Sequence, residues 1–217
     1  KKYALTKNAT GPKYNSLALR TTIEAIIGKE TKIGDLVHRV MVPAVNLTKG
    51  SPQVFKTDHH PTFVRDWKLN VVDVALATSA APAFFPVHKI GSDGGLYANS
   101  PDQLALHEAE HFLEQSLADI SVLSIGTTTS KFSFSNAGST DLGWMGWMEN
   151  QRLPRVMIAA QQLNADFILK HRLKGNYLRI DHDQSPEQER QLALDCASQG
   201  AIDDLRALAE ASAREHL

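Results

Sequence analysis

The residue best suited to chemistry in this sequence is Asp93, a single carboxylate that is followed directly by Gly94 and Gly95. A carboxylate held in a loop can act as a general base. Two glycines after the acid permit a positive φ or a close approach of substrate to the backbone, and simple exit from a strand needs neither property. The Asp93-Gly94-Gly95 run therefore predicts a catalytic acid–base loop, with an ordinary turn as the alternative.

A second constellation is His107-Glu108-Ala109-Glu110-His111, which matches the pattern H-E-x-x-H. On a helix this spacing places two imidazoles on one face, with a glutamate positioned to activate a zinc-bound water. Glu110 places a charge between the histidines, the zinc-peptidase continuation is missing, and Glu114 and Asp119 are poor third ligands. An amphipathic helix with a polar stripe is the favoured interpretation, and a zinc metallopeptidase stays an alternative.

The elements around Asp93 are predicted from local signals. The apolar run Val87 to Ile90 indicates a strand, so Asp93 would lie near its C-terminal end, where open α/β sheets place ligands. Upstream, a helix is expected from an Asn70 N-cap to Ala81, where Pro82 stops it. Downstream, Ser100 and Pro101 resemble the start of a helix reaching about Leu117. These helices would fix the loop between them.

The rest of the chain alternates between helical and strand patterns. This alternation predicts an α/β fold in which a mostly parallel sheet has helices on both faces. The expected elements are a helix at 17–27, strands at 39–47 and 53–56, a strand at 120–125, a helix at 155–173, a strand at 177–180, and helices after Ser185 and from about Ala201.

Two motifs carry a resemblance to a known family: ATSAAPAFFP at residues 77–86 and DGGLYANSP at residues 93–101. In this order and spacing they resemble the second half of the catalytic domain of patatin-like phospholipases, as does the stretch 14–55. Members of that family are lipid acyl hydrolases with a three-layer α/β/α fold and a serine–aspartate dyad. The resemblance implies that Asp93 is the dyad aspartate and that no cofactor is needed.

The nucleophile that this resemblance requires is missing from the sequence. None of the 13 glycines is followed two positions later by serine, so no G-x-S-x-G elbow exists, and neither Ser79 nor Ser92 has that context. The chain also starts at Lys1-Lys2 in a polar stretch. We expect residues 1–217 to be the C-terminal portion of one catalytic domain, incomplete at its N-terminus, with the serine upstream. An inactive paralogue, or a fragment that binds lipid or a partner, is the alternative.

A narrower resemblance joins residues 93–112 with the run VLSIGTTT at 122–129. Together they are similar to bacterial patatin-like effectors of anti-phage defence that cyclic dinucleotides switch on. This resemblance implies a phospholipid substrate and a cyclic dinucleotide activator. The sequence itself contains no recognisable nucleotide-binding fingerprint.

Composition sets the remaining limits. The 217 residues are 42% apolar and carry 23 basic and 24 acidic residues without long runs, which argues against a nucleic-acid polymer as partner. The lone cysteine, Cys196, fits a reducing, cytoplasmic compartment. No apolar run is long enough to span a bilayer, so membrane contact would be peripheral, at the inner membrane. The segment from Trp144 to Trp147 is either packed, which we favour, or an apolar lid.

Overall fold

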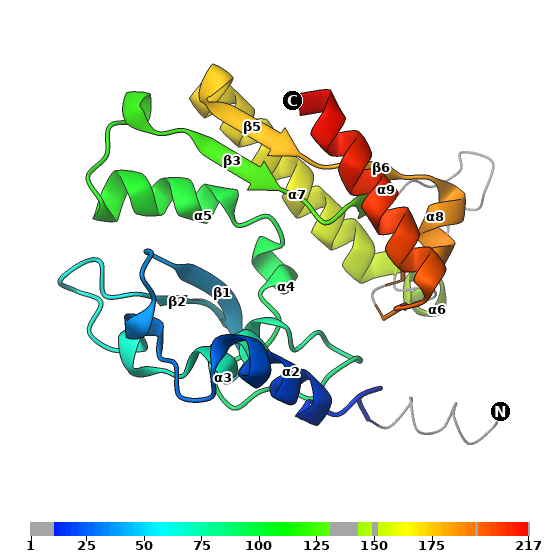
Figure 1. The fold of residues 1–217 in the computed structure, drawn as a ribbon, viewed down its shortest axis with the longest axis horizontal. Helices are drawn as coiled ribbons and strands as arrows, with labels where there is room; N and C mark the ends of the chain where they lie inside the picture. The colour runs from blue at the N-terminus through cyan, green and yellow to red at the C-terminus, as the bar shows by residue number, and fades with distance from the viewer. Residues whose placement is uncertain (1–10, 131–142, 149–151, 194, 217) are drawn as a thin grey trace. The chain divides into compact units, whose positions relative to one another are not determined.

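A computed structural model of the chain describes residues 11–130, 143–148, 152–193 and 195–216 (Figure 1). The contacts divide the chain into two compact units. The first unit contains Lys1–Pro101 and His107–Glu114, and the second contains Asp102–Leu106 and Gln115–Leu217. The polar start of the chain, residues 1–10, lies outside the described residues.

The first unit is built on an antiparallel hairpin of β1 (Met41–Asn46) and β2 (Ser51–Lys56), which confirms both predicted strands. The other edge of β1 pairs at one point, where the N–H and C=O of Val45 each bond to Ser92 at 2.9 Å. Val45 therefore faces its β2 partner Pro52 as a non-hydrogen-bonded pair. Pro43, two residues before Val45, also lies in a non-hydrogen-bonded pair. Pro43 and Pro52 therefore remove no hydrogen bond from the β1–β2 ladder.

Helices pack on this hairpin around a small apolar core. The predicted helix α2 (Leu17–Ile27) is confirmed, and α3 (Val71–Thr78) begins at the predicted cap, where Asn70 Oδ1 accepts the Val72 N–H at 2.8 Å. Short 3₁₀ turns η1 (Ile33–Asp35) and η2 (Asp66–Lys68) lie between them. The core cluster consists of Ile33, Ala44, Phe55, Val74 and Ala77.

The segment between α3 and Asp93 differs from the sequence prediction. Helix α3 ends at Thr78 instead of Ala81, and the predicted strand Val87–Ile90 is wrong because those residues form a turn. Gly91 donates its N–H to the His88 carbonyl at 3.1 Å and so closes that turn. The extended conformation falls on Gly91 and Ser92, and a single turn of helix, α4 (Gly95–Ala98), follows Asp93.

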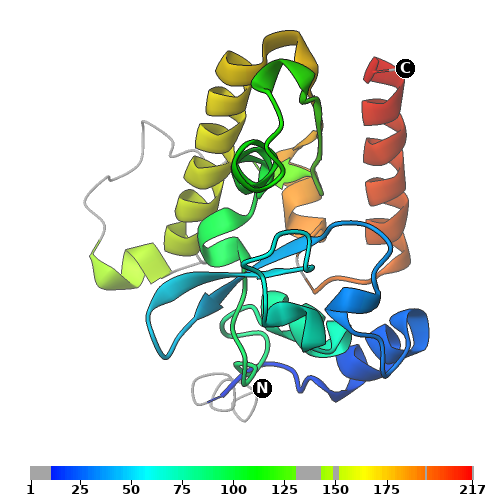
Figure 2. The ribbon, with the colours of Figure 1, turned by 90° about the vertical axis from the view of Figure 1, so that its left-hand side faces the viewer.

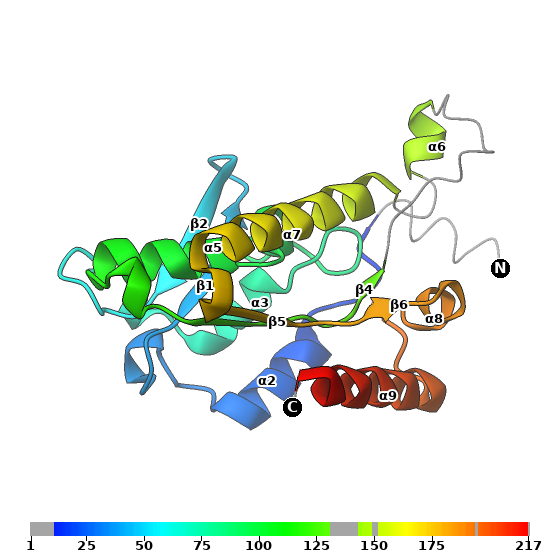
Figure 3. The same cartoon turned by 90° about the horizontal axis from the view of Figure 1, so that it is seen from above.

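The second unit contains the parallel strands. β3 (Val122–Ile125) pairs in parallel with β5 (Tyr177–Ile180), and β4 (Thr129–Ser130) pairs in parallel with β6 (Asp183–Gln184). Figures 2 and 3 show the yellow helix α7 (Arg152–Leu173) and the red helix α9 (Gln199–His216) on opposite sides of the β3–β5 pair. Helices on both faces of a parallel pair are the arrangement that the sequence predicts.

The three helices predicted in the second unit are confirmed, although α7 begins at Arg152, before the predicted residue 155. Helix α8 (Pro186–Gln191) begins directly after Ser185, as predicted. Ser185 caps α8 in a capping box, because its Oγ accepts the Gln188 N–H at 3.2 Å and Gln188 Oε1 accepts the Ser185 N–H at 2.9 Å. The remaining described elements of this unit outside α5 (Asp102–His107) are η4 (Leu117–Asp119), α6 (Trp144–Met148) and η6 (Lys174–Asn176).

One predicted helix is shorter than expected. The helix expected from Pro101 to Leu117 appears as α5 (Asp102–His107), continues as a π-helical turn η3 (Glu108–Phe112), and stops there. Leu113 caps it by donating its N–H to the Glu108 carbonyl at 3.1 Å, and Glu114 then takes a positive φ of 54°.

The two units together give an α/β fold, as predicted, and two of the three strand pairs found among the described residues are parallel. Within the described part of the chain, no helix combines the length and the apolar composition that a membrane-spanning helix needs.

Candidate active site

Asp93 lies in the first unit, between the Ser92–Val45 bridge and helix α4. Its backbone is fixed on both sides. Ser92 is buried and donates its hydroxyl to the Ala80 carbonyl at 3.1 Å, while the Gly94 N–H donates to the Thr78 carbonyl at 3.2 Å. The carboxylate therefore projects from a turn that strand β1 and helix α3 both hold.

Gly94 is required by a close approach of two backbone segments. A Cβ at this position would lie 2.2 Å from the Pro43 carbonyl oxygen and 3.1 Å from the Thr78 hydroxyl. The φ of Gly94 is −67°, so a positive φ is not the reason for the glycine. The expectation of a positive φ in this loop is therefore wrong, and the close approach that requires Gly94 is that of strand β1.

Gly95 orients the carboxylate of Asp93. The Gly95 N–H donates to Asp93 Oδ1 at 2.9 Å, and Gly95 is the first residue of α4. Among the described residues, Asp93 Oδ2 has no hydrogen-bond partner. One oxygen is thereby held in place, and the other is available to accept a proton.

The pKa of Asp93 is raised above its ordinary value, because burial disfavours the charged carboxylate more than the hydrogen bond from Gly95 favours it. A carboxylate with a raised pKa is a stronger base than an exposed one at neutral pH. The geometry and the electrostatics of this turn therefore suit proton transfer.

Two residues that hold this turn, Thr78 and Tyr97, are not indicated by the sequence. Thr78 donates its hydroxyl to the Pro43 carbonyl at 2.7 Å, and Tyr97 donates its hydroxyl to the Gln53 carbonyl at 3.1 Å. Each bond joins segments that lie more than 30 residues apart. Thr78 occurs in the ATSAAP run, but no local pattern indicates which carbonyl it meets.

The two serines near Asp93 have other partners. Ser79 donates its hydroxyl to the Ala75 carbonyl at 2.7 Å along helix α3, and Ser92 is 1% exposed and bonded to Ala80. A nucleophilic serine must instead be exposed at a tight strand-to-helix turn beside oxyanion donors. Neither residue meets that requirement.

The H-E-x-x-H run forms a structural cluster in the first unit. Glu108 is buried at 6% exposure, and its carboxylate bonds to the Lys56 ammonium and, at 2.8 Å, to His59 Nε2. The rings of His107 and His111 stack with centroids 5.3 Å apart. The described residues contain no group of three or more His, Cys, Asp or Glu side chains placed to hold a metal ion. The glutamate that a zinc peptidase would use is thus occupied.

The segment from Trp144 to Trp147 forms part of α6 in the second unit. Trp144 is 74% exposed and Met145 is 84% exposed. The favoured expectation of core packing is therefore wrong for these two side chains.

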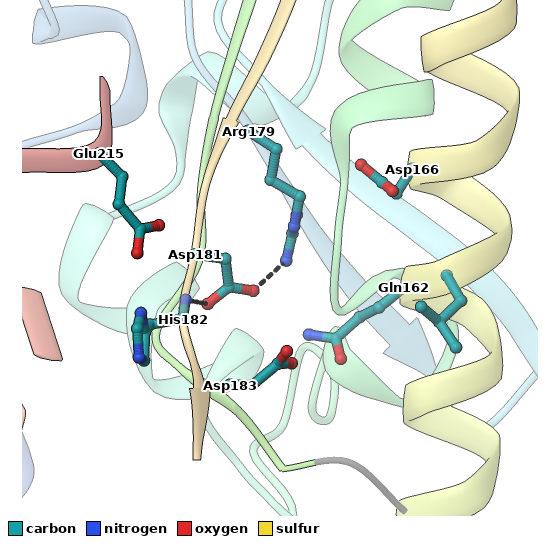
Figure 4. Close-up of a pocket in the computed structure, with 8 residues that line it drawn as sticks. Gln162, Asp166, Arg179, Asp181, His182, Asp183 and Glu215 are labelled. Carbon is teal, nitrogen blue, oxygen red and sulfur yellow. Dashed lines mark hydrogen bonds and ion pairs between the residues drawn. The ribbon is translucent and has the colours of Figure 1, made fainter. Parts of the chain in front are cut away.

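A polar cavity of about 360 Å³ lies in the second unit, at the C-terminal end of β5 (Figure 4). Four carboxylates line it, those of Asp166, Asp181, Asp183 and Glu215. The Arg179 guanidinium in the cavity donates to Asp181 Oδ2 at 2.6 Å. Because acids dominate the lining and neutralise this arginine, the cavity disfavours phosphate groups.

The α/β fold has parallel strand pairs, and Asp93 follows a bridge between Ser92 and strand β1. Comparison with known families identifies the class of protein that has these features. Residues 2–106 match the family described as patatin-like phospholipase. The chain belongs to this family. The match covers the whole Asp93 turn and its supports on β1 and α3.

Three relatives with the same name are similar to most of the chain. The chain is 37% identical over 215 residues to a protein of Vibrio cholerae and 39% identical over 222 residues to one of Escherichia coli, each named cGAMP-activated phospholipase. These alignments cover 91% and 94% of the chain. A protein of Pseudomonas aeruginosa with the same name is 43% identical over 182 residues, or 81% of the chain. The chain spans 61%, 62% and 54% of the lengths of these three relatives.

Proposed function

We propose that this chain is the aspartate-bearing part of a lipid acyl hydrolase, in which Asp93 pairs with a serine from residues outside this sequence. One observation carries the proposal: the half-buried Asp93 carboxylate has one oxygen held by the Gly95 N–H and the other without a partner among the described residues. The serine is assigned outside the sequence because no G-x-S-x-G run occurs within it.

The proposed reaction is acyl transfer in two steps. The serine hydroxyl attacks the ester carbonyl carbon, and Asp93 accepts the hydroxyl proton while backbone N–H groups stabilise the oxyanion. The ester bond breaks, and the leaving alcohol takes the proton from Asp93. Water then attacks the acyl-enzyme and gives a proton to Asp93, which returns it to the serine as the fatty acid departs.

We propose phospholipids as the substrate class and a cyclic dinucleotide as the activator, as expected of an effector in anti-phage defence. The support is that three relatives carry the name cGAMP-activated phospholipase. A substrate in a bilayer requires contact with its surface, so we place the protein in the cytoplasm with peripheral contact at the inner membrane. We also propose that residues 1–217 belong to one catalytic domain, since two of the alignments run across both units.

The direct test replaces Asp93 by asparagine in the complete protein and measures fatty-acid release from phospholipid vesicles. Loss of a general base lowers turnover by about a hundred- to ten-thousandfold. Asp58→Asn is the matched control, because Asp58 is an exposed aspartate of the same unit. Turnover retained by the Asp93 variant would contradict the assignment.

The nucleophile and the activator need separate tests. A fluorophosphonate probe should label one serine in a G-x-S-x-G run outside residues 1–217, whereas a label on Ser79 or Ser92 would contradict the proposal. If no serine is labelled and no turnover is found, the chain binds lipid or a partner without catalysis. Equal rates of hydrolysis with and without cGAMP would remove the activator from the proposal.

A further inference from the structure

Helix α4 is too short to be stable by itself, yet it orients the proposed base. It spans Gly95–Ala98, and its first N–H holds Asp93 Oδ1 at 2.9 Å. A single helical turn fixes several backbone dihedrals for very few hydrogen bonds, so it needs tertiary contacts to persist. Whatever fixes α4 therefore also fixes the Asp93 carboxylate.

The sequence of α4 leaves one side chain that can make a directional contact. The helix reads Gly-Leu-Tyr-Ala, so Tyr97 alone has a polar side-chain atom. Its hydroxyl donates to the Gln53 carbonyl of β2 at 3.1 Å, across 44 residues of sequence. Its N–H donates to the Gly94 carbonyl at 3.3 Å, which joins the same residue to the backbone of the Asp93 turn.

The acceptor of this bond belongs to the β1–β2 hairpin. Gln53 lies in the middle of β2, paired with Ala44 of β1, and Ala44 is fully buried in the core cluster. The Tyr97 phenol is half-buried, and burial raises its pKa, so the hydroxyl stays protonated as a donor at neutral pH. The bond therefore ties α4 to the hairpin on which the core of the first unit is built.

We infer that Tyr97 is a positioning residue for the proposed hydrolysis, and that its hydroxyl fixes α4 so that the Gly95 N–H keeps Asp93 in its catalytic orientation. This inference rests on the proposed function of Asp93. Tyr97 itself touches no reacting atom. Its effect on the reaction passes through the Gly95 N–H and the Asp93 carboxylate.

The test is Tyr97→Phe in the complete protein, which removes one oxygen and keeps the ring. We expect kcat to fall about three- to tenfold, the effect of one hydrogen bond, with KM changed less than twofold. The bond from Gly95 lowers the pKa of Asp93, so loosening it raises that pKa. The acid limb of the kcat profile should therefore move to higher pH.

Tyr177→Phe is the matched control, because it removes a phenol oxygen from the second unit and should leave kcat and its pH profile unchanged. A Tyr97→Phe protein with wild-type kcat and acid limb would overturn the inference. So would a lower melting temperature and lower kcat with an unmoved acid limb, since that pattern indicates a general structural role. If Asp93→Asn keeps its turnover, the proposed function fails instead.

Discussion

Replacing Gly94 by alanine is the sharpest test of how the Asp93 turn is held. The new Cβ would lie 2.2 Å from the Pro43 carbonyl oxygen, 2.8 Å from its carbonyl carbon and 3.1 Å from Thr78 Oγ1. Normal contacts between such atoms are above 3 Å, so the turn and strand β1 must separate by at least about 1 Å. Two of the three atoms are backbone, and no side-chain rotation relieves the overlap.

The cost follows from what the separation would disturb. Pro43 lies inside β1 opposite Val54, and its carbonyl accepts the Thr78 hydroxyl at 2.7 Å. Two residues before Gly94, the turn is fastened by the Ser92–Val45 bridge, with both hydrogen bonds at 2.9 Å. Overpacking of this kind costs about 1–3 kcal/mol. For a protein of this size we expect the melting temperature to fall by roughly 3–10 °C.

The assay is urea and thermal unfolding of Gly94→Ala beside Gly11→Ala. A Cβ on Gly11, in the same unit, would meet no atom within 4 Å, so this variant measures the effect of the substitution alone. Gly95→Ala is a second comparison, because its nearest atom is the movable Asn99 Oδ1 at 2.8 Å. A free energy of unfolding for Gly94→Ala within about 0.5 kcal/mol of the Gly11 variant would refute the backbone-contact argument.

Three other changes have measurable outcomes. Because the pKa of Asp93 is raised in the folded state, that state binds more protons between the unfolded and folded pKa values, and stability falls as pH rises through that interval. Asp93→Asn should therefore be more stable than the wild type at pH 7, and the gain should vanish below the unfolded pKa of about 3.9. An equal gain at all pH values would contradict this. Glu108→Ala leaves the partly buried Lys56 and His59 without their carboxylate, so it should lower the free energy of unfolding by about 2–4 kcal/mol, and added zinc should not stabilise the wild type. Ser185→Ala removes the α8 cap and should cost about 1 kcal/mol, whereas no change would show that this helix end is already frayed.

Much of the fold was predictable because its signals are local. Helix α2 and strand β5 have the predicted ends at both termini, and the α8 capping box is visible as Ser185-Pro186-Glu187-Gln188. Each depends on periodicity or on a cap within four residues, which the sequence shows directly.

The errors occur where a distant partner decides the conformation. Val87 to Ile90 has a strand-like composition. Among the described residues, however, the second edge of β1 pairs at Ser92 alone, and the residues before Ser92 form a turn that Gly91 closes onto His88. Gly91 packs where its Cβ would meet Ala44 at 3.3 Å and Ala77 at 3.5 Å. That contact places Gly91 between β1 and α3, and no pattern within residues 87–91 encodes it.

The partners of the two carboxylates distinguish the two motifs that could carry chemistry in this sequence. Glu108 in the H-E-x-x-H run and Asp93 in the glycine run are both carboxylates removed from full solvent exposure. Glu108 is matched by a lysine and a histidine, so its charge is neutralised within the first unit and serves packing. Asp93 has one backbone N–H and a raised pKa, so its charge is left partly uncompensated. A fold optimised for stability alone would pair or remove such a carboxylate, and the proton transfer that we propose for Asp93 accounts for its presence.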